Sequence, residues 1–350
     1  MSARPDVAEA GRAAASFGFA ADAAITPVLS GHVNESFHVR GAQGDALLQW
    51  LSTVAFADPL AVQANVERVV VQLARAAPER CWPALLSTAQ GAGHVQRASG
   101  LWRAWSWLPD RVTVSRPDSP ARAAAGGAAF AAFVRALEDL PGPTLALTLP
   151  GFHALDRRLA QLEAALADAD AARIRSADDL LETVARRRVA YLDGVAGRSR
   201  ILHGDPKFGN LLFGVEDPPV VIDYDTVMYG PLAWDFGDFL RSAATTGDED
   251  VPEAVALDEP LLEAAARGYL SAAPAAWREE QASLAHAPGY IAFTLGVRFL
   301  TDHLAGDRYF RVTRPRQNLD RARTQLRLAA AFDAARGRLE AILRALARSR

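Results

Sequence analysis

Residues 203–223 of this chain read HGDPKFGNLLFGVEDPPVVID. The stretch places an aspartate, Asp205, five positions before an asparagine, Asn210, and it ends in a second aspartate, Asp223. Two short apolar runs, LLF and VVI, lie between Asn210 and Asp223 and are separated by the turn-forming residues GVEDPP, which is the pattern of a β-hairpin. We therefore expect the three polar side chains to converge at one end of a hairpin.

This set of side chains suits phosphoryl transfer from a nucleotide. That reaction needs a carboxylate to accept the proton of the attacking hydroxyl, and hard oxygen ligands that hold Mg²⁺ against the phosphates. The protein-kinase catalytic loop, H-R-D-x-x-x-x-N followed by a metal-binding aspartate, has the same Asp-to-Asn interval. Any one of these residues alone would more often satisfy backbone donors of a turn. The ordered set predicts Asp205 as the base and Asn210 and Asp223 as magnesium ligands.

Two neighbouring residues are expected to support this loop. His203 stands two positions before Asp205, and we interpret it as holding the loop by hydrogen bonding rather than as a base. Asp235 begins a D-F-G triplet spelled like the metal-binding motif of protein kinases. It lies beyond the hairpin and leads into an apolar, helical pattern, so it is not at the expected metal position. We predict that Asp235 braces the catalytic loop.

In the rest of the chain, the sequence pattern changes from strand-like to helical near residue 108. Residues 26–107 are strand-like with glycine turns, interrupted by a helix predicted over 59–76, where Asp58 can cap and Pro59 suits the first position. Beyond residue 110, Ala/Leu/Arg-rich segments of helical period prevail around the hairpin. The sequence predicts an α+β, protein-kinase-like fold of two lobes. They are a small β-rich nucleotide-binding lobe, residues 1–108, and a larger mainly helical catalytic and substrate-binding lobe, residues 109–350.

Composition excludes several other classes of protein. Half of the 350 residues are hydrophobic, which suffices for a sizeable core, and the net charge of −3 creates no field that gathers nucleic acid or an anionic membrane. The charged first twenty residues are unlike a secretory signal, and no run approaches the roughly twenty apolar residues of a membrane span. We expect a cytoplasmic protein. The single cysteine, Cys81, allows no internal disulfide and is expected to be a small buried residue. Composition sets no oligomeric state.

On these motifs the chain resembles the aminoglycoside-phosphotransferase-like kinases, whose pattern is His-Gly/Asn-Asp, then Asn, then a strand ending in Ile-Asp. Within that group it is most similar to the N-acetylhexosamine 1-kinases. The most specific similarity is RFLTDHLAGDRYF at residues 298–310 with NLDRAR at 318–323, and residues 31–34, 48–59 and 222–238 add to it. The resemblance implies that ATP and Mg²⁺ serve as cofactors and that Asp205 deprotonates the anomeric hydroxyl of a small sugar.

The resemblance also implies roles for residues outside the catalytic loop. Arg298, Tyr309 and His32 fall where the family contacts its sugar. Without the family, the first two would be interpreted as surface or packing residues. The loop that contains Gly31 and Asn34 is implied to cover the nucleotide phosphates, and Gln49 stands where protein kinases carry a phosphate-holding lysine. The hexosamine kinases resemble this chain in that glutamine.

Two alternatives to a sugar 1-kinase stay open. Trp50 and Gly204 stand where the hexosamine kinases tend to have Arg and Asn, which leaves the identity of the sugar undecided. The acceptor could be another small hydroxyl compound, namely an aminoglycoside, an amino alcohol or homoserine, although the Arg-rich block from residue 298 argues against a cationic antibiotic. The missing lysine leaves a nucleotide-binding pseudokinase as the second alternative, which the intact Asp205, Asn210 and Asp223 disfavour.

Overall fold

The computed structural model describes residues 4–28, 34–53, 55–142, 144–215 and 218–348, and the chain forms two compact units. The smaller unit comprises Met1–Arg111, Asp139–Leu149 and Ile222–Val227, and the larger comprises Val112–Glu138, Pro150–Val221 and Met228–Arg350. The expected division at residue 108 remains a prediction about domains. The compact units differ from it because two later segments belong to the smaller unit.

The smaller unit contains a six-stranded antiparallel sheet of order β1-β2-β3-β6-β4, with β5 paired to β6. Its strands are β1 (Ala24–Val28), β2 (Glu35–Gly41), β3 (Gly44–Trp50), β4 (Leu85–Leu86), β5 (Val95–Arg97) and β6 (Gly100–Ser106). Gly44 turns the β2–β3 hairpin with a φ of 113°, a conformation that favours glycine. One face of the sheet buries Phe37, Leu48 and Trp102.

Two helices complete the smaller unit, α1 (Val7–Ser16) and α2 (Pro59–Ala76). The predicted bounds of α2 are confirmed, since the Asp58 carboxylate accepts the N–H of Ala61 at 3.0 Å and proline occupies the first turn. The interpretation of Cys81 was wrong. Its side chain is exposed, because it follows the turn after α2 and precedes the short strand β4 instead of lying within either.

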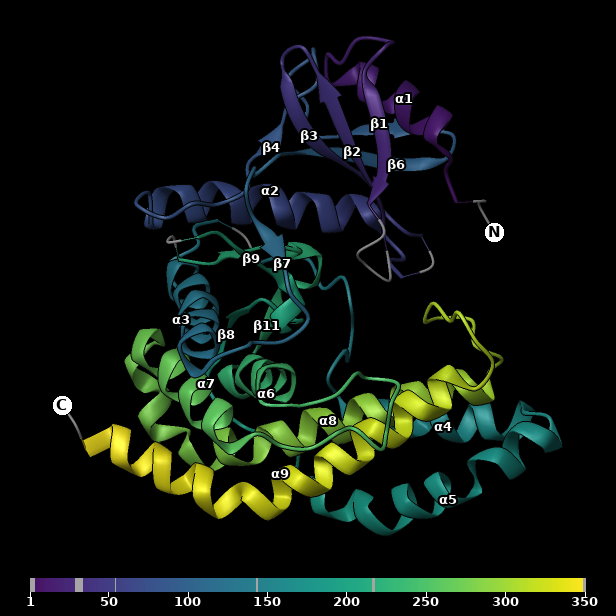
Figure 1. The fold of residues 1–350 in the computed structure, drawn as a ribbon, viewed down its shortest axis with the longest axis vertical. Coiled ribbons are helices and arrows are strands. Elements are labelled where there is room, and N and C mark those ends of the chain that lie inside the picture. Colours follow the sequence, from purple (N-terminus) through teal and green to yellow (C-terminus); the bar gives the residue numbers. More distant parts are fainter. Residues whose placement is uncertain (1–3, 29–33, 54, 143, 216–217, 349–350) are drawn as a thin grey trace. The chain divides into compact units, whose positions relative to one another are not determined.

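The larger unit is mainly helical, as expected. Its helices are α3 (Pro120–Ala136), α4 (Leu155–Asp168), α5 (Ala171–Arg187), α6 (Leu232–Ala243), α7 (Glu259–Ala272), α8 (Gln281–Leu304) and α9 (Gln317–Arg348). Glycines let these helices approach closely: a Cβ at Gly268 would lie 2.1 Å from the carbonyl oxygen of Ala124 on α3. The long helices α8 and α9 run beside each other (Figure 1).

Short strands of the larger unit flank the loop that carries Asp205 and Asn210. The predicted hairpin is confirmed: β9 (Leu211–Phe213) pairs antiparallel with β10 (Val220–Val221), and β7 (Val112–Thr113) joins the other edge of β9. A separate pair is formed by β8 (Ser199–Leu202) and β11 (Met228–Pro231). The loop that carries Asp205 therefore begins where β8 ends and finishes where β9 begins.

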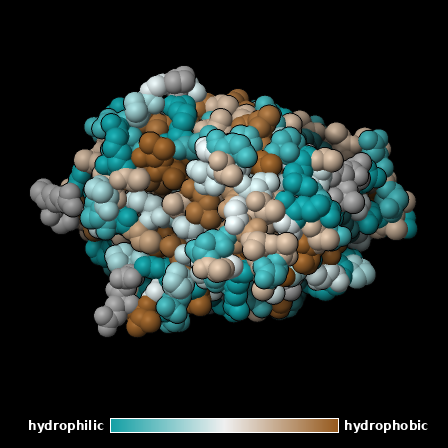
Figure 2. All heavy atoms as spheres, turned by 90° about the horizontal axis from the view of Figure 1, so that it is seen from above, coloured by the Kyte–Doolittle hydropathy of each residue, from teal (hydrophilic) through white to brown (hydrophobic). Residues whose placement is uncertain are grey.

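The described helices include none that is long and apolar enough to cross a membrane. On the face drawn in Figure 2, hydrophobic residues occur in small groups among hydrophilic ones.

Candidate active site

Asp205 and Asn210, paired from their spacing in sequence, are in contact. The amide Nδ2 of Asn210 donates to the backbone oxygen of Asp205 at 2.8 Å and to its carboxylate Oδ2 at 3.2 Å. The short 3-10 helix η2 (Phe208–Asn210) creates this contact by turning the loop back. Among the described residues no donor reaches Oδ1 of Asn210. This oxygen is therefore available to a hard cation.

A cation lies directly beside the predicted base. The ammonium Nζ of Lys207 is 2.8 Å from Oδ2 of Asp205. Burial by itself raises the pKa of a carboxyl group, but Lys207, and then His203 and Arg241, outweigh it and hold the pKa of Asp205 below its usual value of 3.8. Asp205 is therefore ionised at neutral pH. Sequence reasoning missed Lys207, although it is the only lysine in the chain and lies inside the quoted stretch.

Asp235 on α6 holds the start of the loop. Its carboxylate accepts the backbone N–H of His203 at 2.8 Å and that of Gly204 at 2.9 Å. Burial raises the pKa of Asp235 to about 7, although these two bonds oppose the shift. The ring of His203 is itself buried, with the rings of Phe130 and Phe133 at centroid distances of 5.2 and 5.3 Å. These contacts support the bracing roles expected of Asp235 and His203.

His153 holds the same loop from its other side, and no sequence signal pointed to it. Its Nε2 lies 2.9 Å from the carbonyl oxygen of Gly204. Burial lowers the pKa of His153 to about 4, so the ring is neutral, and its proton is on Nε2 because a carbonyl oxygen can only accept. Gly204 is thus tied through both its N–H and its C=O, which leaves Asp205 on a rigid backbone.

A small cavity of about 30 Å³ opens beside Asp205 within the larger unit. Arg298 of α8 lines it together with Asp205, and the ring of Phe152 and the hydroxyl-bearing Thr294 contribute further walls. The other carboxylate that lines the cavity belongs to Asp238, which forms a buried ion pair with Arg241 at 2.7 Å. Asp205 and Arg298, which are far apart in sequence, are therefore neighbours in one pocket.

The guanidinium of Arg298 is surrounded by aromatic rings. Its central carbon lies 4.5 Å from the ring centroid of Phe152, 5.4 Å from that of Phe310 and 6.0 Å from that of Tyr309. Within the described ranges no carboxylate comes within ion-pair distance of it. The predicted substrate residues Arg298 and Tyr309 thus lie together, and the cation keeps its hydrogen-bonding capacity for another molecule.

Asp302, also on α8, positions the two aromatic residues that follow the helix. Its carboxylate accepts the backbone N–H groups of Arg308, Tyr309 and Phe310 at 2.8–2.9 Å, and the side-chain amide of Asn318 at 2.9 Å. This arrangement explains physically why the sequence block from residue 298 forms one unit. A buried carboxylate converts an irregular loop into a fixed wall beside Arg298.

The residues expected to bind the nucleotide belong to the smaller unit. Of these, Gly31 lies outside the described residues, as does His32, which was expected to contact the sugar. Asn34 donates to the carboxylate of Asp225 at 2.6 Å and accepts from the N–H of Ser52 at 3.0 Å. Gln49 also has partners within its own unit, described below. Both side chains are therefore already engaged by protein groups.

Asp223, the second expected metal ligand, has an unusual backbone. Its φ of 69° and ψ of 64° are left-handed, a conformation that costs a residue with a side chain roughly 1–2 kcal/mol and that is frequent at functional sites. It directly precedes the 3-10 helix η3 (Tyr224–Thr226). Within the described parts of the chain, no three His, Cys, Asp or Glu side chains gather around a possible metal. Mg²⁺ suits such a sparse set, since it usually keeps waters and substrate phosphates as ligands.

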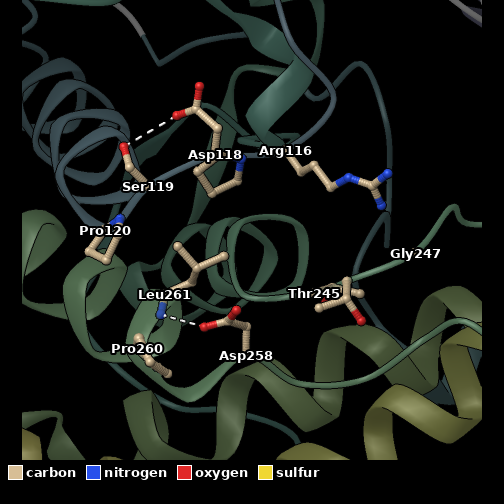
Figure 3. Close-up of a pocket in the computed structure, with 11 residues that line it drawn as sticks. Arg116, Asp118, Ser119, Pro120, Thr245, Gly247, Asp258, Pro260 and Leu261 are labelled. Carbon is tan, nitrogen blue, oxygen red and sulfur yellow. Dashed lines mark hydrogen bonds between the residues drawn. The ribbon is translucent and has the colours of Figure 1, made fainter.

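A larger cavity of about 380 Å³ lies elsewhere in the larger unit, between the first turns of α3 and α7 (Figure 3). Several of its polar side chains are already engaged by nearby groups of the protein. The carboxylate of Asp258 accepts the backbone N–H of Leu261 at 3.0 Å, and the hydroxyl of Ser119 accepts that of Arg122 at 3.3 Å. The guanidinium of Arg116 lies 3.4 Å from the carboxylate of Asp248. Neither Asp205 nor Arg298 lines it, so its size alone does not make it the site of chemistry.

Comparisons with known proteins bear on the family and the fold of this chain. A family model described as "Phosphotransferase enzyme family" matches residues 24–282. The fold is similar to a microcompartment-associated aminopropanol kinase (TM-score 0.62, 15% identity, 95% of this chain and 97% of that one). It is also similar to an amicoumacin kinase solved with AMP-PNP and Ca²⁺ (TM-score 0.58, 14% identity, 87% of this chain and 88% of that one). A third similar structure is an aminoglycoside phosphotransferase from Alicyclobacillus acidocaldarius (TM-score 0.55, 16% identity, 99% of this chain and 98% of that one). The α+β, protein-kinase-like fold expected from the sequence is thereby confirmed.

Proposed function

Because this chain belongs to the phosphotransferase enzyme family and is a small-molecule phosphotransferase acting on hydroxyl groups, we propose that its acceptor is a small sugar. The donor in this proposal is ATP with Mg²⁺. The reacting group is the anomeric hydroxyl of an N-acetylhexosamine, so the enzyme is a sugar 1-kinase.

The observation that carries the proposal is the shared pocket of Asp205 and Arg298. Apart from Asp205 itself, the carboxylate lining this pocket is Asp238, whose charge is already paired with Arg241. Arg298 brings a cation without a carboxylate partner among the described residues. A cationic amine would therefore meet repulsion from Arg298, whereas hydroxyl and amide oxygens would find a donor.

The aromatic residues beside Arg298 also suit a sugar. Tyr309 is 41% exposed and offers an apolar ring face next to polar groups. The cavity has room for about one water molecule. In our proposal the reacting hydroxyl enters this cavity and approaches Asp205, while the sugar ring lies outside it against the aromatic wall.

The contacts of individual residues support the roles that we propose for them. Asp205 takes the proton of the attacking hydroxyl, and Lys207 keeps it ionised for that purpose. Oδ1 of Asn210 and the carboxylate of Asp223 would ligate the metal, which when bound neutralises charge on the phosphates. The amicoumacin kinase of the same fold was solved with AMP-PNP and Ca²⁺, which favours a nucleotide and a divalent cation here. The proposed nucleotide-binding residues remain Gly31, Asn34 and Gln49. His32 remains a proposed sugar-binding residue.

The test is ADP release with MgATP and paired acceptors. N-acetylglucosamine and N-acetylgalactosamine are compared with glucosamine, which replaces the amide by an amine, and with the 1-O-methyl glycosides, which block the anomeric oxygen. Turnover that needs both the amide and the free anomeric hydroxyl supports the proposal. Turnover with choline, an aminoglycoside or homoserine instead would replace the sugar by another hydroxyl compound. Nucleotide binding without turnover on any acceptor would favour a pseudokinase.

A further inference from the structure

Arg103 is a buried arginine on β6 that faces Gln49 on β3. The two residues are direct cross-strand partners, so their side chains project on the same side of the sheet. Oε1 of Gln49 accepts from Nε and Nη2 of Arg103 at 2.9 and 2.5 Å, and from Nε1 of Trp105 at 3.2 Å. The glutamine at the lysine position therefore serves as the acceptor that orients a neighbouring cation.

The same guanidinium reaches the segment that follows Asp223. Nη2 of Arg103 donates to Oδ1 of Asp225 at 2.5 Å, and both side chains are almost completely buried, at 1% and 2% exposure. The other carboxylate oxygen, Oδ2, accepts from Asn34. A planar, fixed fork of donors suits Arg103 for bridging two acceptors at once. Asp225 is thereby tied to β6 through Arg103 and to the start of β2 through Asn34.

This tie bears on Asp223, two residues earlier. A left-handed aspartate persists only where its surroundings over-determine the backbone. Before it the chain leaves β10, and after it Tyr224 packs its buried ring edge-on against Trp105, with centroids 5.9 Å apart. The ion pair between Asp225 and Arg103 then fixes the end of this turn. Together these contacts hold residues 223–225 in one conformation.

In protein kinases a lysine on the third strand and a glutamate on the next helix form the ion pair of the nucleotide lobe. Here Glu67 of α2 accepts instead from Gln63 at 2.9 Å and lies 3.5 Å from His94. The buried cation of this unit comes from Arg103. Its partner is Asp225, on the metal-binding segment itself.

We propose that Arg103, oriented by Gln49 and paired with Asp225, is the positioning residue that holds Asp223 ready for the metal–nucleotide complex. This inference rests on the proposed function, because it assumes that Asp223 is a metal ligand. Arg103 acts through Asp225 and does not itself touch the reacting atoms.

The test measures Mn²⁺ binding by electron paramagnetic resonance in the presence of AMP-PNP and without acceptor. Removing an outer-shell partner usually weakens metal affinity by roughly 10–100-fold. We expect a loss of this size for Arg103→Met and for Asp225→Asn, while the acceptor KM stays within about twofold. The double variant should bind Mn²⁺ no more weakly than the worse of the two single variants, since both substitutions break the same ion pair. Arg40→Met, an exposed arginine of β2 in the same sheet, is the matched control.

The outcomes separate the two proposals. If the wild-type protein binds no Mn²⁺ with AMP-PNP, the proposed function fails. If the wild type binds and Arg103→Met binds equally well, the positioning role of Arg103 is overturned and the kinase assignment stands. Should Arg103→Met not fold, Asp225→Asn preserves the shape of the pair and tests the same link, and undiminished Mn²⁺ affinity in that variant overturns the inference.

Discussion

Lys207 places its ammonium 2.8 Å from the carboxylate of Asp205, and no other lysine occurs in the chain. Since burial alone would raise the pKa of Asp205, this cation decides that the carboxylate stays ionised well into acid. For Lys207→Met we expect the pKa of Asp205 to rise, so that the acid limb of kcat/KM moves to higher pH. Lys207→Arg keeps the charge and is the control. An acid limb unmoved by Lys207→Met would contradict the electrostatic role.

Asp205→Asn removes the proposed base but preserves its shape. We expect turnover to fall by about 100-fold or more, the usual size of a general-base contribution, with the KM for ATP little changed. The assay is steady-state ADP release. Asp179→Asn, at an exposed carboxylate on α5, should keep full turnover. If Asp205→Asn turned over like the wild type, another group would have to be the base.

Arg298→Lys keeps a positive charge but loses the flat guanidinium that stacks between aromatic rings. Such a stacked cation contributes about 0.5–2 kcal/mol, and its bidentate donors are lost as well. We expect the acceptor KM to rise by about 10-fold in Arg298→Lys and by more in Arg298→Met. The KM for ATP should stay constant in both. Equal rises in the two KM values would mean that Arg298 supports the structure generally and does not select the acceptor.

Asp302→Ala leaves three backbone N–H groups without their acceptor and removes one of the two acceptors of the Asn318 amide, which also donates to Asp307. Unsatisfied buried groups cost about 1–3 kcal/mol each, part of which water can recover. We expect the free energy of unfolding to drop by about 3 kcal/mol and the acceptor KM to rise, because Tyr309 and Phe310 lose their fixed positions. Chemical denaturation and acceptor titration measure these effects. Asp302→Asn, which keeps one acceptor oxygen, should lie between the wild type and Asp302→Ala.

Glu9 provides a pH-dependent contribution to the stability of the smaller unit. The hydroxyl of Ser99, opposed by burial and aided by Arg12 and Arg97, lowers the pKa of Glu9 from 4.5 to about 2. A carboxyl pKa that is lowered by folding stabilises the protein above pH 4.5, and this stabilisation is lost as the pH falls toward 2. Glu9→Gln should therefore be less stable than the wild type at pH 7, and the difference should shrink below pH 4.5. A difference independent of pH in denaturant titrations would contradict this assignment.

Local patterns were the dependable part of the sequence. The helix over residues 59–76 was predicted to its ends because its cap and its apolar spacing are both local. The contact between Asp205 and Asn210 followed from their interval, since one short turn brings them together. The interpretation of Cys81 as buried was wrong, because burial depends on what packs over a residue and not on its type.

The parts of the site that were missed come from distant segments. His153 precedes α4, yet it holds Gly204. The ion pair of Asp238 and Arg241 on α6 neutralises a carboxylate that lines the cavity beside Asp205. No motif near these residues in the sequence predicts these contacts. The contact of Gln49 with Arg103 could not be predicted either, because it depends on which residue lies opposite Gln49 on β6.

By itself, the sequence determined the contact between Asp205 and Asn210 and the hairpin after it, because both depend on short intervals that backbone geometry translates directly into contacts. The family resemblance likewise rests on short motifs. Only the tertiary structure decided which cations meet which carboxylates. Arg103 reaches Asp225 across more than a hundred residues, and Arg298 faces Asp205 across nearly as many. Such pairings are set by the packing of whole strands and helices, and that packing also excludes the water that would otherwise screen the charges.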